Sequence, residues 1–328
     1  MKRIIISGGY YATNIGNAFY EIGAKYVLNK CLSDRATVEL SSNKLDIYWS
    51  RLTGARAGLF DLTNTYEADY VVILGPTLSV DYLSRWEDTF SKLSAKGTRF
   101  VFMSTGASRY DDKEYEGVSA ILKRFKFYAL LSRDEKTYEL YKDCFEHSYN
   151  GICCALYCAD YAPKRPLDLK PYVIFNFDNC REPVPVPAAG GIEICNNTYD
   201  LKKAARLSKA PLPERLPSGE TIIRTIHTVM PGVVRRNLKG SNYYISDVPY
   251  DYLTLYAHAS AVLTNRVHAA VASVSYGTPV HLTNATPRGN ILKRIGAQAA
   301  YREMYRSDAG YLESEKRKYE DAIREIFQ

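Results

Sequence analysis

Long apolar runs and targeting segments are missing from this sequence of 328 residues. No stretch of about eighteen uncharged apolar residues occurs, which excludes an ordinary transmembrane helix. The apolar run in MKRIIISGG, residues 1–9, is too short for a secretory signal peptide. These absences predict a cytoplasmic protein whose contact with a membrane, if it has one, is peripheral and at the inner face.

Metal-binding patterns are missing as well. The seven cysteines are an odd number without a regular framework, as expected of reduced thiols. Cys153, Cys154 and Cys158 are clustered, but structural zinc sites use paired Cys-x-x-Cys units. No two aspartates lie two positions apart, so the Asp-x-Asp metal pair of single-domain sugar transferases is lacking. We expect buried thiols, no metal ligands and no resident cofactor.

Common nucleotide and hydrolase motifs are also absent. No Gly-x-Gly-x-x-Gly fingerprint, no Gly-Lys-Ser/Thr phosphate loop and no Gly-x-Ser-x-Gly elbow occurs. The net charge is +7, but the basic residues are spread rather than gathered in runs, so no nucleic-acid footprint is visible. This charge suits a small anionic substrate or a lipid-linked substrate at a membrane surface.

What the sequence does contain is an alternation of short β-branched runs with amphipathic segments. Hydrophobic residues make up 46% and charged residues 24%, as in folded soluble proteins, and the length favours two domains. The alternation is typical of a parallel α/β fold. In the first half we expect strands at 2–7, 45–49, 69–74 and 99–104, and helices near 15–30, 79–95 and 134–143.

The segment YAPKRPLDLKP, residues 161–171, interrupts this alternation before it restarts. We therefore predict two Rossmann-like domains with parallel sheets, residues 1–165 and residues 166–328. Residues 181–219 are rich in loop-forming residues and are left without an assignment. The expected elements of the second half are strands at 172–177, 221–227, 243–246, 261–264 and 279–283, helices from about 249, 267 and 290, and a charged C-terminal helix.

The first candidate site is SGGYYATNIGN, residues 7–17, which leaves the first strand and enters a helix near Ile15. Such a loop presents free backbone amides and the positive end of a helix at the edge of the sheet where ligands of these folds bind. Gly9, Asn14 and Asn17 are its candidate ligand contacts. The alternative is that the glycines only make a turn and that Asn14 only caps the helix.

The second candidate site is TNRVH, residues 264–268, between a buried strand and a helix of small residues that ends at Gly277. Arg266 and His268 then lie at a helix N-terminus, where cations oppose the helix dipole unless an anion binds there. A guanidinium can hold a carboxylate or phosphate with two hydrogen bonds, and an imidazole can transfer protons near neutral pH. The alternative is a solvent-facing arginine beside a histidine that packs the helix.

The sequence resembles the polysaccharide pyruvyl transferase family. The resemblance is carried by GGYYATNIGN (8–17), DYVVILGPTLS (69–79), LLSRDEKTYEL (130–140), TNRVHAAVASVSYGTPVHL (264–282) and PRGNILKRIG (287–296). It implies a two-domain, GT-B-like fold with phosphoenolpyruvate as the donor and a sugar or lipid-linked oligosaccharide of a cell-surface glycan as the acceptor. The product would be a pyruvate ketal that bridges two hydroxyls.

Carried onto this sequence, the resemblance places the donor on the second domain and the acceptor on the first. Arg266 would hold one anionic group of the donor, and His268 would act as acid or base. Arg133, Arg288 and Lys293 follow by position as further anion contacts, and Asn14 and Asn17 would face the donor or the acceptor.

The sequence departs from the family pattern at two places. Asn17 replaces the aspartate of the usual Asn-x-Gly-Asp, which removes that residue as a general base, and Ser104 and Thr105 replace the usual Gln-Ser. Two other functions remain compatible with the residues: a GT-B glycosyltransferase that uses a nucleotide sugar, and a non-catalytic relative that binds a glycan or an anion.

Overall fold

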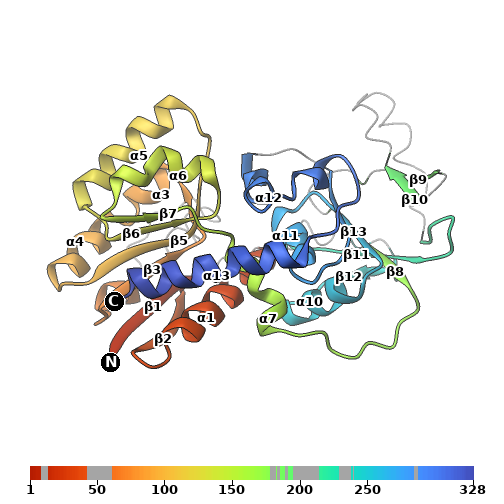
Figure 1. The fold of residues 1–328 in the computed structure, drawn as a ribbon, viewed down its shortest axis with the longest axis horizontal. Helices are drawn as coiled ribbons and strands as arrows, with labels where there is room; N and C mark the ends of the chain where they lie inside the picture. The colour runs from red at the N-terminus through yellow and green to blue at the C-terminus, as the bar shows by residue number, and fades with distance from the viewer. Residues whose placement is uncertain are drawn as a thin grey trace.

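The computed structural model describes residues 1–8, 14–42, 61–177, 182, 185–188, 191–194, 214–228, 238, 240–283 and 287–328. Two parallel sheets form its frame, one in each half of the molecule in Figure 1. Among the described residues, helices pack on both faces of the first sheet and on one face of the second, whose other face contacts Leu216 and Met304. The expected parallel α/β architecture is confirmed.

The first sheet has the strand order β2-β1-β3-β5-β6-β7, with β4 paired to β5, and every pairing in it is parallel. Alternate side chains point to opposite faces, so Ile4 and Ile6 pack under α1 while Ile5 packs toward α3, α4 and α5. The bounds are β1 Lys2–Gly8, β2 Ala36–Ser42, β3 Tyr70–Leu74, β4 Thr77–Leu78, β5 Arg99–Ala107, β6 Ala129–Ser132, β7 His147–Tyr149, α1 Gly16–Leu32, α3 Val80–Ser84, α4 Glu87–Ala95, α5 Asp112–Phe125, α6 Glu135–Tyr141 and α7 Cys158–Tyr161.

The second sheet has the order β12-β11-β8-β13-β14 and is parallel throughout. A short antiparallel pair, β9 and β10, lies apart from it. The bounds are β8 Tyr172–Asn176, β9 Pro185–Ala188, β10 Gly191–Ile194, β11 Thr221–Thr225, β12 Tyr243–Tyr244, β13 Ala261–Thr264, β14 Val280–Leu282, α10 Pro249–His258, α11 Val267–Ser275, α12 Asn290–Arg294 and α13 Ala309–Ile326. Short 3-10 helices complete the fold at Leu62–Thr65, Lys142–Cys144, Cys154–Tyr157, Pro287–Gly289 and Gln298–Tyr301.

Most of the expected elements are present, with several differences. The segment 79–95 forms two helices, α3 and α4, rather than one, because the chain turns at Arg85 and Trp86. Strands β2, β4, β6 and β7 and helices α5 and α7 were not expected. The expected strand 45–49 lies outside the described residues.

One continuous core connects the two sheets. It contains the inner faces of β1, β3 and β13, helices α1 and α11, and the buried segment 152–158. The five cysteines at described positions are free and buried, as expected, and Cys180 and Cys195 lie outside the described residues. The segment from Tyr161 to Tyr172 runs from the first sheet to the second, so the division near residue 165 stays a prediction that agrees with this course.

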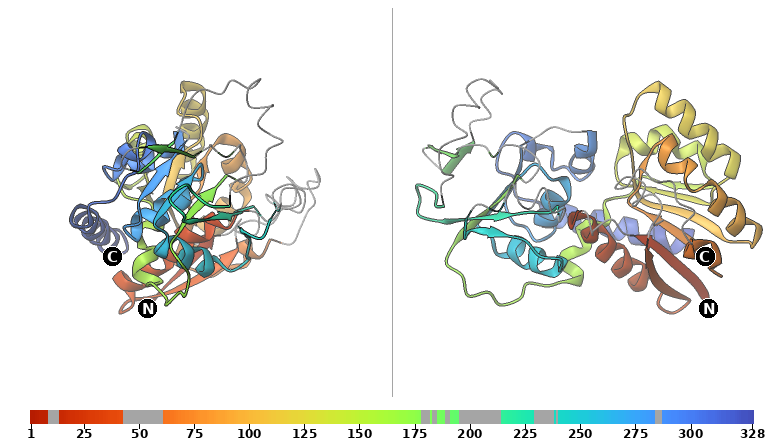
Figure 2. Two further views of the ribbon diagram at one scale, coloured as in Figure 1. Left: turned by 90° about the vertical axis from the view of Figure 1, so that its right-hand side faces the viewer. Right: turned by 180° about the vertical axis from the view of Figure 1, so that it is seen from behind.

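The C-terminal helix α13 runs along both halves of the molecule (Figures 1 and 2). Near its start, the Ser307 hydroxyl donates to the carbonyl of Val274 on α11, 3.0 Å away. Near its end, the Tyr128 hydroxyl of the first sheet donates to the carbonyl of Ile326, 2.7 Å away. No helix in the described part of the chain combines the length and apolarity that a membrane crossing requires.

Candidate functional site

The ends of three neighbouring strands are held in register by one buried amide. The Asn176 Nδ2 atom on β8 donates to the carbonyl of Thr225 on β11 at 2.7 Å, and its Oδ1 accepts from the hydroxyl of Thr264 on β13 at 3.0 Å. The same Thr264 hydroxyl accepts from the backbone N–H of Arg266 at 2.8 Å. This network fixes the turn from β13 into α11.

Arg266 and His268 lie at the start of α11, where the sequence predicted them. Strand β13 ends at Thr264 and α11 begins at Val267, so Arg266 is the N-cap residue. Both side chains are half-buried. The Arg266 Nη2 atom donates to the Thr228 hydroxyl, 2.9 Å away, which orients the guanidinium beside the carboxyl end of β11.

Arg133 comes from the first domain and is almost completely buried. It follows β6, and its backbone N–H donates to the carbonyl of Thr105 at 2.9 Å. The guanidinium lies against Gly106, where an added Cβ atom would come within 2.5 Å of Nε. In the described part of the chain this Nε has no hydrogen-bond partner. A buried, unpaired donor of this kind is costly unless a ligand satisfies it.

Charge interactions bring Arg133, Arg266, Arg288 and His268 into one cluster. Burial and then repulsion from Arg133, Arg288, His227 and Arg266 hold the pKa of His268 well below its usual range. Desolvation, followed by repulsion from Arg133 and Arg266, also lowers the pKa of Arg288, although part of that side chain is exposed. The imidazole is therefore neutral at neutral pH and is surrounded by positive charge.

Helix α1 brings the first domain onto this cluster. The buried ring of Tyr20 meets the His268 imidazole edge-on, with centroids 5.0 Å apart. The backbone N–H of Ile15 donates to the carbonyl of His227 at 2.8 Å, and Gly16 lies so close that a Cβ there would be 3.0 Å from His227 Nδ1. The N-terminus of α1 and the loop after β11 are thus in direct contact.

The other predicted site residues differ in their placement. The Asn14 Oδ1 atom accepts from the backbone N–H of Gly16 at 3.2 Å in the turn before α1, whose N-cap residue is Ile15, and its contact with a ligand stays a prediction. Asn17 is half-buried in the first turn of α1. Lys293 is exposed on α12, and none of the described contacts joins it to His268. Gly9 lies outside the described residues.

Sequence reasoning missed His227, Thr228 and Tyr20. His227 is fully buried directly after β11, and its Nε2 atom hydrogen-bonds the Tyr256 hydroxyl on α10. The signal was available, because a histidine that ends a buried strand falls at the same edge of the sheet as Arg266. Tyr20 had no such signal, since a tyrosine in a helix is usually packing.

Ser104, one of the two departures from the family pattern, has a structural role. Its φ of 56° is in the left-handed region, which is rare for a residue with a side chain. Its hydroxyl accepts from the backbone N–H of Cys154 at 3.1 Å and so ties β5 to the buried segment 152–158.

The assembled site can bind an anion and move a proton. The guanidinium groups of Arg133, Arg266 and Arg288 are near enough to the neutral His268 imidazole for their charges to lower its pKa. No group of three His, Cys, Asp or Glu side chains in the described ranges is placed to hold a metal ion.

Comparison with known proteins identifies the family and the fold of this chain. A family model described as polysaccharide pyruvyl transferase matches residues 3–284. Comparison with curated proteins gives no match.

Several solved structures are similar in fold. The complex of S. aureus MnaA with UDP has a TM-score of 0.53 at 12% identity, covering 95% of this chain and 94% of that one. The UDP-N-acetylglucosamine 2-epimerase of Rickettsia bellii has a TM-score of 0.52 at 12% identity, covering 100% and 95%. That of Methanocaldococcus jannaschii with UDP-GlcNAc and UDP has a TM-score of 0.51 at 14% identity, covering 90% and 88%. At identities of 12–14%, this similarity establishes only the fold, which is of the GT-B type.

Proposed function

Because the chain belongs to the polysaccharide pyruvyl transferase family, we propose that it transfers the pyruvyl group of phosphoenolpyruvate to two hydroxyls of a glycan sugar. The product is a pyruvate ketal on a sugar of a cell-surface glycan. The reaction takes place in the cytoplasm, with a lipid-linked oligosaccharide at the inner face of the membrane as one form of the acceptor.

The observation that carries this proposal is the cationic cluster around His268. Phosphoenolpyruvate has two anionic groups, a carboxylate and a phosphate, and each can be held by a guanidinium with two parallel hydrogen bonds. Arg133 approaches from the first domain, and Arg266 and Arg288 approach from the second. The repulsion among these three groups is relieved when a ligand with several negative charges binds between them.

The chemistry needs one proton at the donor carbon and a leaving phosphate. The methylene carbon of phosphoenolpyruvate takes up a proton while one sugar hydroxyl oxygen bonds to the neighbouring carbon. A second hydroxyl oxygen then bonds to that carbon as its bond to the phosphate oxygen breaks. The two hydroxyls lose two protons in all, of which one goes to the methyl group and one leaves with the phosphate.

His268 is suited to move these protons because the donor changes its charge environment. In the free protein, burial and the neighbouring arginines keep the imidazole neutral. A bound polyanion reverses the sign of the nearby charge and raises the pKa of His268 toward neutrality. The imidazole can then accept a proton from a sugar hydroxyl and pass one on.

A second candidate function is transfer from a nucleotide sugar. It is favoured by one observation: proteins of similar fold are solved with UDP, as in S. aureus MnaA and the M. jannaschii epimerase. The diphosphate of such a donor would also match the cluster of Arg133, Arg266 and Arg288.

Calorimetry on the wild type and three variants tests the proposal. We expect phosphoenolpyruvate to bind the wild type, and we expect Arg266→Lys and Arg133→Lys each to weaken this binding by roughly 1.5 to 3 kcal/mol, because an ammonium group cannot reproduce the paired hydrogen bonds. His268→Ala should bind the donor but turn over on the order of a hundred-fold more slowly.

The exposed Lys293→Met is the matched control, since no described contact joins Lys293 to His268. Binding of UDP or a UDP-sugar in place of phosphoenolpyruvate would support the second function instead. If phosphoenolpyruvate binds equally well to the wild type and to both arginine variants, the cationic cluster is not the donor site.

A further inference from the structure

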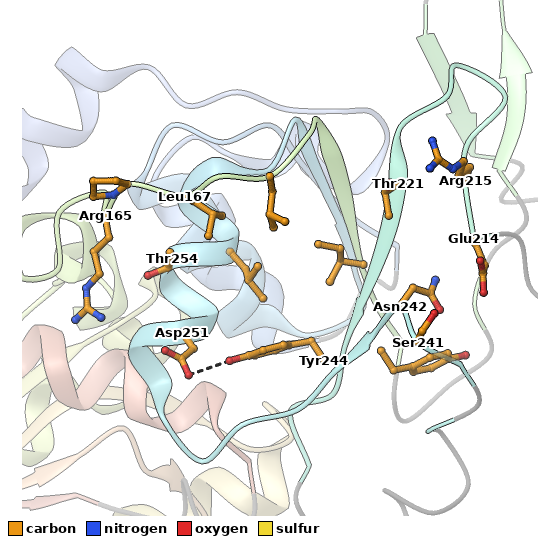
Figure 3. Close-up of a pocket in the computed structure, with 15 residues that line it drawn as sticks. Arg165, Leu167, Glu214, Arg215, Thr221, Ser241, Asn242, Tyr244, Asp251 and Thr254 are labelled. Carbon is orange, nitrogen blue, oxygen red and sulfur yellow. Dashed lines mark hydrogen bonds between the residues drawn. The ribbon is translucent and has the colours of Figure 1, made fainter.

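A pocket of about 630 Å³ lies on the flank of the second domain, at the edge of its sheet. Its walls are the segment 165–169, which connects the two sheets, the strands β11 and β12, and helix α10 (Figure 3). A volume of this size suits a ligand of one or two sugar units.

The pocket is separate from the cationic site. It is lined by Thr221 and Ile223 from the first part of β11, whereas His227 follows the carboxyl end of that strand. The pocket also lies at the β12 edge of the sheet, and β13, which leads to Arg266, is beyond β11 and β8. No residue that lines the pocket belongs to the cluster around His268.

The lining combines an apolar floor with polar side chains at both ends. Leu167, Ile223 and Leu255 contribute apolar surface. In Figure 3, Asp251 and Thr254 stand at one end, and Asn242 and Ser241 stand at the other. Sugar rings present both kinds of surface, with hydroxyls around the rim and C–H groups on the faces, so they match this pattern.

One tyrosine ring is held in a fixed position in the wall. The Tyr244 hydroxyl donates to Asp251 Oδ2 at 2.9 Å. The neighbouring Tyr243 side chain points to the opposite face of the sheet, where its ring lies 5.6 Å from the guanidinium of Arg224. A ring that is already ordered, such as that of Tyr244, loses little conformational entropy when a sugar packs on it.

The connecting segment, residues 165–169, is also held in place by contacts with α10. The His258 Nε2 atom hydrogen-bonds the carbonyl of Arg165 at 2.6 Å, and the Arg165 guanidinium lies 5.4 Å from the Tyr250 ring. The wall that contains Leu167 is therefore held against α10 before any ligand binds.

The charges in the pocket are balanced, unlike those of the cationic site. The lining contains two cations, Arg165 and Arg215, and two carboxylates, Glu214 and Asp251. Equal numbers of each sign give no preference for an anion such as a nucleotide or phosphoenolpyruvate. The chemistry of the pocket therefore favours a neutral polar ligand.

We propose that this pocket is a second carbohydrate-binding site, which holds a neutral sugar unit of the acceptor glycan away from the hydroxyls that react. The proposal rests on the proposed function for the identity of the glycan as acceptor. It adds that the protein selects long acceptors over short ones, because only an oligosaccharide can occupy the pocket and reach His268 at the same time.

A glycan array followed by saturation-transfer NMR tests the binding step. We expect the wild type to bind neutral oligosaccharides without phosphoenolpyruvate. Tyr244→Ala and Ser241→Trp, which remove a ring and fill the pocket, should each weaken binding about tenfold or more. Arg266→Ala should bind the same glycans as the wild type.

Tyr115→Ala is the matched control, because this tyrosine is exposed on α5 in the first domain. Melting temperatures establish that each variant is folded, and Ser241→Trp covers the case in which Tyr244→Ala is not. With a long acceptor, Tyr244→Ala should raise KM without changing kcat. With a monosaccharide acceptor, neither constant should change.

The results separate this proposal from the proposed function. Turnover with phosphoenolpyruvate but no array binding that depends on Tyr244 or Ser241 would overturn the second site alone. Pocket-dependent glycan binding without any use of phosphoenolpyruvate would support the site and overturn the donor. A nucleotide or an extended peptide that binds along β12, and no glycan, would overturn the second site.

Discussion

The His268 imidazole and the Tyr20 ring touch edge to face, with centroids 5.0 Å apart and planes at 69°. This contact joins a helix that follows the first strand of one sheet to a helix that follows a central strand of the other. Tyr20 also fills the space beside Gly75, which has a φ of 64° at the end of β3. The tyrosine therefore connects the imidazole to the end of β3 in the first sheet.

Replacing Tyr20 tests this positioning role. Burial raises the pKa of its hydroxyl, so the group stays protonated and is not a base. We expect Tyr20→Phe to keep kcat near the wild-type value. Tyr20→Ala should lower kcat about tenfold, because the aromatic contact, worth roughly 0.5 to 1.5 kcal/mol, is lost. Equal kcat values for the two variants would show that the ring does not position His268.

Gly106→Ala should weaken donor binding without unfolding the protein. The new methyl group would come within 2.5 Å of Arg133 Nε and 2.7 Å of Nη2, so the guanidinium must move. We expect the dissociation constant for phosphoenolpyruvate to rise about tenfold or more, as when a charge-assisted hydrogen bond is broken. Calorimetry measures the change, and a melting temperature close to that of the wild type shows that the fold is intact.

For Gly106, the comparison variant is Gly97→Ala. Gly97 has nothing within 4 Å of an added Cβ atom and lies in the turn before β5, but its φ is 85°. Gly97→Ala should therefore lower the free energy of unfolding through backbone strain and leave the affinity for phosphoenolpyruvate unchanged. If Gly106→Ala instead binds phosphoenolpyruvate with wild-type affinity, Arg133 does not contact the donor.

Donor binding should be accompanied by proton uptake at neutral pH. The pKa of His268 is depressed in the free protein, so the imidazole is neutral well above that value. A bound anion raises the pKa, and the imidazole then takes up a proton from solution. Calorimetry in two buffers of different ionisation enthalpy measures this uptake. It should be absent in His268→Gln and should fade as the pH falls through the depressed pKa.

Asn176→Ala should destabilise the second domain. The side chain is fully buried and links Thr225 to Thr264, so its removal leaves a buried carbonyl and a buried hydroxyl short of partners. We expect a loss of roughly 1 to 3 kcal/mol in the free energy of unfolding, measured by urea denaturation. Because Arg266 follows Thr264 in this network, donor affinity should fall as well, whereas an alanine variant of Asn64, which is half-buried in the first domain, should leave donor affinity unchanged.

Turnover should survive removal of divalent metal ions. The sequence offers no cluster of carboxylates or thiolates with ligand spacing, and the cationic cluster already supplies the charge that a metal ion would bring to the phosphate. Extensive chelation should leave kcat unchanged. Activity that disappears on chelation and returns with added magnesium or manganese would contradict this expectation.

The sequence predicts most strongly where hydrophobic pattern and burial agree. The strands β1, β3, β5 and β8 are buried on both faces, so each is a nearly continuous apolar run in the sequence. The edge strand β2, ATVELSS, gives a weak signal, because Glu39 and Leu40 are exposed. Helix α5 has a clear signal that was overlooked: the Asp111 side chain accepts from the backbone N–H of Glu114.

The site residues that could be predicted are likewise those with a local signal in the sequence. Arg266 and His268 could be predicted because they interrupt an apolar segment at the end of a strand. The roles of Tyr20 and Gly106 could not, since both depend on contacts between segments far apart in the chain. The residues next to Gly106 in the sequence do not indicate that the Arg133 guanidinium packs against it.

The course of α13 has a consequence for how this protein is made. Its last residues complete the core of the first sheet: the Phe327 ring packs 5.0 Å from that of Tyr70, and Lys2 bonds the carbonyl of Gln328. A nascent chain that ends at residue 171 has therefore synthesised the whole first sheet but lacks the helix that covers one of its faces. Such a fragment should bind a hydrophobic dye, and added peptide 309–328 should displace it. During synthesis, the first domain therefore cannot complete its core until α13 has been made. Its contacts with α13 join residues that are far apart in the sequence, and such long-range contacts form slowly, so they limit how soon the domain becomes native.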